Sequence, residues 1–124
     1  MKDENNTKTP ENFPEKNKLL KGKNKLFQRL HIDKIVKGGT KKTTISLETL
    51  SYEFLSLKLG AVPHTKKANQ VIKIWLIEEM KQGLQAGTYD PQAPYYFSIW
   101  LKQVILWELV DQKIASKWLD NLNN

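Results

Sequence analysis

The sequence predicts a mainly α-helical fold with one short β-strand, and three observations lead to it. Residues 42–47 alternate apolar with hydrogen-bonding side chains and are rich in β-branched residues, a pattern typical of a strand. Four later segments repeat apolar residues at helical spacing, and glycine or proline separates most of them. The length of 124 residues fits one small domain with a tail and excludes a large multidomain enzyme.

Basic charge is concentrated near the N-terminus. The net charge is +7, and residues 1–42 hold 12 Lys and Arg against 5 Asp and Glu, whereas residues 43–124 hold 8 of each. Residues 1–24 have few large apolar groups to offset the entropy of ordering. We therefore predict that residues 1–40 are a basic, largely disordered arm, which serves either as a solubilising tail or as a nucleic-acid-binding segment. Within it, Leu26, Phe27 and Leu30 indicate a short helix over residues 25–36 that ends at Gly38.

The predicted strand has two different faces. Lys42, Thr44 and Ser46 point to one side, and Thr43, Ile45 and Leu47 to the other. The sequence shows no second strand nearby, and an isolated strand is not stable in water. We therefore expect this strand to pair with its copy in a second chain, as an intersubunit two-stranded antiparallel ribbon.

Four helices are predicted after the strand. The first covers residues 49–59 and ends at Gly60, and the second begins after Thr65 as N-cap and runs to about Gln82. The second carries apolar residues around most of its circumference, which requires cover from other protein. The last two helices, over residues 95–111 and 112–122, belong to an apolar extension, residues 83–124, that we expect to form dimer or tetramer contacts.

A basic segment, one short strand and two helices joined by a tight turn resemble the ribbon-helix-helix superfamily of the Arc, MetJ and CopG type, over residues 41–82. The resemblance implies a homodimer whose paired ribbon enters the major groove of double-stranded DNA. It makes Lys42, Thr44 and Ser46 the base contacts. It also implies a phosphate contact at the start of the second helix, through His64, Thr65, Lys66 and Lys67.

The function expected on this basis is sequence-specific DNA binding by a transcriptional repressor or autoregulator. Two alternatives stay open: a plasmid or mobile-element accessory factor acting in a relaxosome or in partition, and an antitoxin-like protein whose C-terminal helices bind a protein partner. We expect further phosphate contacts from the basic residues around and before the strand, namely Lys18, Lys21, Lys23, Lys25, Arg29 and Lys41.

Catalysis has no support in the sequence. His31 and His64 are the only histidines, cysteine is absent, and no phosphate-binding glycine motif occurs. We therefore expect neither an enzyme nor a metal or cofactor. The basic N-terminal residues lack an apolar signal segment, so we expect a cytoplasmic protein without membrane contact.

Overall fold

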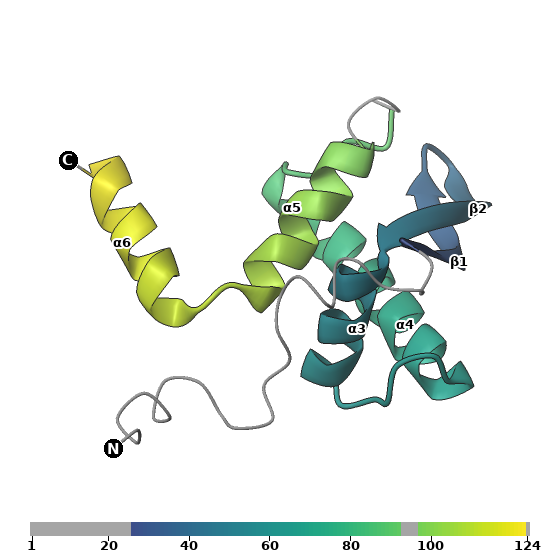
Figure 1. Ribbon diagram of the computed structural model, residues 1–124. Helices are drawn as coiled ribbons and strands as arrows, with labels where there is room; N and C mark the ends of the chain where they lie inside the picture. The colour runs from purple at the N-terminus through teal and green to yellow at the C-terminus, as the bar shows by residue number, and fades with distance from the viewer. Residues whose placement is uncertain (1–25, 93–96, 124) are drawn as a thin grey trace, which may run out of the picture.

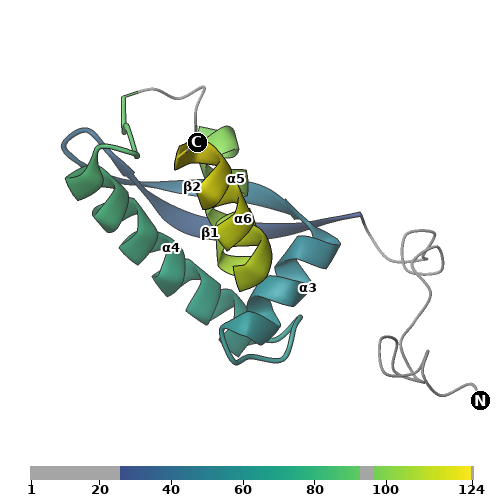
Figure 2. The same cartoon turned by 90° about the vertical axis from the view of Figure 1, so that its left-hand side faces the viewer.

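The computed structural model describes residues 26–92 and 97–123, which form a two-stranded antiparallel sheet and four helices. All four helices lie on the same side of the sheet (Figures 1 and 2). The fold is therefore mainly α-helical with a short β-ribbon, as the sequence predicted. In chain order the elements are β1 (Phe27–Val36), β2 (Gly39–Glu48), α3 (Thr49–Lys58), α4 (Lys66–Ala86), α5 (Phe97–Leu109) and α6 (Gln112–Asn123).

The helix expected over residues 25–36 was wrong, because residues 27–36 form strand β1. This strand pairs with β2 in an antiparallel register that sets Leu30 opposite Ile45 and Val36 opposite Gly39. Two residues turn the chain between the strands, and the second of them, Gly38, has a φ of 86°, which glycine adopts without steric cost. The turn and the alternation of Leu30 and Ile32 with polar residues favour a hairpin over a helix.

The expectation that residues 42–47 find their strand partner in a second copy was also wrong, because β1 of the same chain takes that place. Residues 42–47 lie inside β2, and their hydrogen-bonding partner is β1 of the same chain. The folded domain also extends further toward the N-terminus than the limit that we placed at residue 40. Residues 26–40 belong to the hairpin, whereas residues 1–25 lie outside the described part of the chain.

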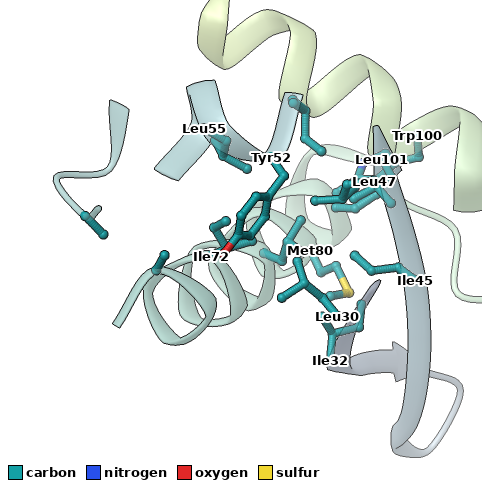
Figure 3. Close-up of a cluster of buried hydrophobic side chains, with 14 of the residues drawn as sticks. Leu30, Ile32, Ile45, Leu47, Tyr52, Leu55, Ile72, Met80, Trp100 and Leu101 are labelled. Atoms are coloured by element: carbon teal, nitrogen blue, oxygen red, sulfur yellow. The ribbon is translucent and has the colours of Figure 1, made fainter. Parts of the chain in front are cut away.

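A single core joins the hairpin to three helices. Leu30, Ile32, Ile45 and Leu47 form the inner face of the hairpin and are buried. Figure 3 shows them turned toward side chains of α3, α4 and α5. The buried partners are Tyr52 and Leu55 of α3, Ile72, Leu76 and Met80 of α4, and Trp100, Leu101 and Ile105 of α5.

The helix ends follow the expected signals. Thr65 caps α4, where its hydroxyl accepts a hydrogen bond from the Ala68 N–H at 3.1 Å, and Gly60 follows α3 with a left-handed φ of 86°. Helix α4 continues past Gln82 and ends where Gly87 adopts a φ of 80°. None of the helices in the described ranges is long and apolar enough to cross a membrane.

Helix α4 is less enclosed than its sequence suggested. It buries one stripe, which consists of Ala68, Ile72, Leu76, Met80 and Gly83. Ile74 on another side of the helix is 53% exposed. Residues 26–92 and 97–123 of one chain therefore leave some apolar residues of α4 exposed.

Tyr89, just after the end of α4, contacts both the hairpin and α5. Its hydroxyl donates a hydrogen bond to the Ile35 carbonyl oxygen at 2.6 Å, and its ring centroid lies 4.8 Å from that of Trp100. Burial raises the pKa of the Tyr89 hydroxyl above its usual value. A Cβ added at Gly83 would lie 2.7 Å from the Tyr89 Cβ, so the position requires glycine.

We expect Gly83→Ala to destabilise the protein by about 1–3 kcal/mol, because the added methyl group must displace Tyr89. At an ordinary helix position the same substitution stabilises by about 1 kcal/mol, so the sign of the effect is diagnostic. Urea unfolding measures the change. Gln82→Ala, at the exposed neighbouring position of α4, is the control and should stay within about 0.5 kcal/mol of wild type. Equal or greater stability of Gly83→Ala would contradict this packing.

Candidate nucleic-acid interface

The outer face of the hairpin carries two facing rows of polar side chains. The register sets Arg29 opposite Ser46, His31 opposite Thr44, and Asp33 opposite Lys42. All are exposed except Asp33, which is partly buried. The alternation along β2 thus gives Lys42, Thr44 and Ser46 the shared exposed face that we expected. Their role as base contacts stays a prediction.

Contacts across the strands organise these two rows. His31 Nδ1 lies 2.9 Å from Thr44 Oγ1, within hydrogen-bonding distance. Lys42 Nζ lies 3.7 Å from Asp33 Oδ1, and the Lys42 side chain is 92% exposed. An exposed ion pair of this kind stabilises little, so Lys42 can leave Asp33 for another anion at small cost. The His31–Thr44 contact instead holds two groups that can both donate and accept hydrogen bonds.

The contribution of β1 to this face was not predicted from the sequence. Arg29 was expected to contact phosphate from the arm, and His31 was assigned no role, because residues 25–36 were interpreted as a helix. The structure places both side chains beside the predicted base contacts of β2. The strict alternation from Arg29 to Asp33, followed by Gly38 and Gly39, was the signal that identifies the strand.

Polar residues at the start of α4 form a second cluster, which is hydrogen-bonded to α3. His64 has a φ of 64°, its N–H donates to the Tyr52 hydroxyl at 2.9 Å, and its Nε2 lies 2.6 Å from Glu53 Oε2. The Tyr52 hydroxyl donates in turn to Asn69 Oδ1 at 2.7 Å. Thr65 donates its hydroxyl to the Val62 carbonyl oxygen at 2.6 Å while it caps the helix. His64 and Thr65 thus have structural partners within the protein.

The remaining predicted phosphate contacts are dispersed. Lys66 and Lys67 are exposed in the first turn of α4, and Lys41 is exposed close to the hairpin turn. Residues 27–48 hold five basic residues against Asp33 and Glu48. Four predicted contacts, Lys18, Lys21, Lys23 and Lys25, lie outside the described residues.

No family model, curated protein or solved structure matches this chain. The ribbon-helix-helix resemblance is therefore a prediction based on residues 41–82 alone. Within residues 26–92 and 97–123, no three His, Asp or Glu side chains come together as a metal site would require. The hairpin's outer face, defined by Arg29, His31, Asp33, Lys42, Thr44 and Ser46, is the candidate functional site.

We expect Tyr52→Phe to destabilise the protein by about 1–2 kcal/mol, because Asn69 Oδ1 and the His64 N–H would each lose this partner in a partly buried place. Chemical unfolding measures the change. Thr43→Ser, a hydroxyl-retaining change on the hairpin, serves as the control and should cost less. A Tyr52→Phe variant as stable as wild type would show that the turn between α3 and α4 does not depend on this hydroxyl.

Proposed function

We propose that this chain binds double-stranded DNA with the outer face of its β1–β2 hairpin and acts as a sequence-selective regulator, such as a repressor of transcription. The observation that carries the proposal is the pair of facing polar rows on β1 and β2. Between them the rows offer a guanidinium, an ammonium, an imidazole and two hydroxyl groups. These are the side-chain groups that make hydrogen bonds to base edges.

The shape of the hairpin supports the proposal. The major groove is about 12 Å wide and admits a two-stranded β-ribbon, whose strands lie about 4.8 Å apart. Ten residues of strand extend for about 33 Å, which is close to one helical turn of DNA. Helices α3, α4 and α5 pack on the opposite face and α6 lies beyond them (Figures 1 and 2), so no helix of the described ranges lies between the outer face and a duplex.

The hairpin of a single chain supplies the whole of this proposed DNA-binding face. In the ribbon-helix-helix family, DNA recognition depends on a ribbon shared by two copies, whereas β1 and β2 of this chain pair with each other. The proposal is therefore a different one from the family mechanism: both strands of the ribbon, and both rows of side chains, come from the same polypeptide.

Charge also favours a polyanion. The hairpin carries a net charge of +3, from five basic and two acidic residues in positions 27–48. Most of the other basic excess lies in residues 1–25, directly before β1. Lysine and arginine near a duplex neutralise phosphates and release counterions, which adds affinity without sequence preference.

The side chains of the two rows can make different kinds of contact with DNA. Arg29 has the planar fork that binds guanine O6 and N7 through two hydrogen bonds. Lys42 can exchange Asp33 for a guanine or a phosphate. His31 and Thr44, at 2.9 Å from each other, present a coupled donor and acceptor pair at the centre of the face. Selectivity would come from this central pair and from guanine contacts of Arg29 and Lys42, and affinity from phosphate contacts of the charged residues.

We expect the combined variant Lys42→Ala, Thr44→Ala, Ser46→Ala to lose its preference for a duplex that the wild type selects from a randomised library. Each good base contact discriminates by about 1–3 kcal/mol, so the preference over random duplex should fall at least tenfold. His31→Ala should reduce the preference without a large decrease in non-specific affinity. Fluorescence anisotropy with selected and random duplexes measures both quantities.

The matched control for charge compares Arg29→Ala, Lys42→Ala with Lys113→Ala, Lys117→Ala, since each pair removes two positive charges and the second pair lies on α6. Only the first should affect selection. Wild-type protein that selects no sequence, or equal effects of the two pairs, would remove the support for DNA reading by the hairpin.

The basic residues before β1 give a separate prediction. Replacing Lys18, Lys21, Lys23 and Lys25 with glutamine should reduce the slope of log affinity against log salt concentration by up to about 0.9 for each phosphate that is no longer neutralised. Selection between duplexes should persist, because these residues contact no base edges in the proposal. An unchanged slope would show that this segment takes no part in binding.

A further inference from the structure

Helix α6 has an apolar stripe that the described residues of its own chain leave uncovered. None of its twelve residues is buried, and Ile114, Trp118, Leu119 and Leu122 are between 46% and 62% exposed. At 100° per residue these four side chains fall within one side of the helix, and Lys113, Lys117 and Asp120 lie on the other. A surface helix with this pattern buries its apolar side against protein.

Helix α5 also has a stripe of apolar side chains that the described residues leave exposed. Trp100, Leu101 and Ile105 are buried in the core, whereas Ile99, Leu106 and Trp107 on another side of α5 are each more than half exposed. Val110 and Asp111 alone connect α5 to α6, which extends away from the body of the protein (Figure 1). The two helices meet only near their junction, where the Trp107 and Trp118 ring centroids lie 5.6 Å apart.

We propose that a second copy of this chain covers both stripes at once: α6 of each copy packs on the exposed stripe of α5 in the other. The exchange is reciprocal, so two-fold symmetry satisfies the two surfaces in both copies. It gives the expected homodimer contact in residues 83–124 a definite place. The inference does not depend on DNA binding by the hairpin.

Charge favours a second copy over other occupants. Residues 97–123 hold three basic and three acidic residues, so this part of a chain of net charge +7 is neutral. Two copies can therefore approach through α5 and α6 without the repulsion that their basic N-terminal halves would produce. A helix that binds an anionic membrane surface is usually rich in Lys and Arg on its polar side, whereas the polar side of α6 has only Lys113 and Lys117 against Asp120, a net charge of +1.

The available area is also appropriate for a specific dimer. Seven large apolar side chains per copy, each about half exposed, would be covered on both sides of the contact. Their burial removes on the order of 1,200–1,600 Å² from water, which is the size of a stable protein–protein interface. An isolated helix of twelve residues is marginal in water, so the contact would also stabilise α6 itself.

An apolar groove continues this surface toward the hairpin. Its volume is about 270 Å³, and α5 contributes Leu101, Ile105, Leu106 and Leu109 to its wall. Leu106 belongs both to the groove and to the exposed stripe of α5. The second copy's α6 can therefore rest on Leu106 with the groove beside it.

Sedimentation velocity tests the dimer. At concentrations on the order of 10–100 µM we expect wild-type protein at twice the chain mass of 14.4 kDa. Trp118→Glu, Leu122→Glu should raise the dissociation constant at least about 100-fold, because two carboxylates would enter an apolar contact. Ser116→Glu, Asn123→Glu adds the same charge outside the stripe and should remain dimeric. A monomeric wild type, or equal behaviour of the two variants, would overturn the proposal.

Mixing tests the exchange itself. A chain with Ile99→Glu, Leu106→Glu has a damaged α5 stripe but an intact α6, and a chain with Trp118→Glu, Leu122→Glu has the reverse. Each alone should be monomeric. Mixed in equal amounts, they should form a heterodimer through the one contact in which both surfaces are intact. Failure to associate would overturn reciprocal packing of α6 on α5.

Two further measurements test whether the variants keep their fold and whether the α6 stripe binds a membrane surface instead of a second copy. The near-ultraviolet circular dichroism, to which the core aromatic residues Tyr89 and Trp100 contribute, should be unchanged in Ile99→Glu, Leu106→Glu and in Ser116→Glu, Asn123→Glu, because these variants remove no aromatic side chain. Trp118→Glu, Leu122→Glu also removes the Trp107–Trp118 ring contact, so its fold is checked by the midpoint of urea unfolding, which should match that of Ile99→Glu, Leu106→Glu. A wild-type monomer whose α6 stripe mediates binding to phosphatidylserine vesicles would assign the stripe to a membrane surface and overturn the proposal.

Discussion

The rest of the structure depends on strand pairing within one chain. Ten residue pairs between β1 and β2 fix which side chains of each strand face the helices and which face solvent. A shift of β1 by one residue in this register would turn Leu30 and Ile32 toward solvent and bring polar side chains such as Arg29 and His31 into the core. Burial of Leu30, Ile32, Ile45 and Leu47 on the helices excludes that shift. The core thereby determines the composition of the exposed polar face.

The sequence predicted the four helices and the strand in β2, but not the strand in β1. The start of α4 and the end of α3 were readable because local chemistry determines them: Thr65 accepts a bond from the third residue after it, and Gly60 adopts a backbone angle that other residues resist. The end of α4 was placed at about Gln82, whereas the helix continues to Ala86 and Gly87 ends it. The β1 segment was ambiguous because Leu26, Phe27 and Leu30 have helical spacing. Tertiary contacts decide such a case, since the helices bury Leu30 and Ile32 while Leu26 and Phe27 stay exposed.

Only the β2 half of the candidate site could be predicted from the sequence, because β1 was interpreted as a helix. Period-two alternation identified Lys42, Thr44 and Ser46 as an exposed row, and it needed no knowledge of the partner strand. The facing row of Arg29, His31 and Asp33 depends on the register, which cannot be derived once β1 is taken for a helix. At the start of α4, residue type suggested an anion site. Sequence could not show that Tyr52 and Glu53 of α3 already engage His64.

The chain separates its charge from its uncovered apolar surface. The basic excess lies in residues 1–42, whereas the exposed stripes of α5 and α6 belong to a neutral segment. Apolar association is strongest where no net charge opposes it, and phosphate attraction needs basic side chains that remain solvated. Each surface would weaken the other if they overlapped. The helices lie on one side of the hairpin and the polar rows on the other, so a chain paired through α5 and α6 keeps the facing pairs His31–Thr44 and Asp33–Lys42 accessible. Ser46 lines the groove beside α5 and is the member of the rows that lies closest to the pairing surface.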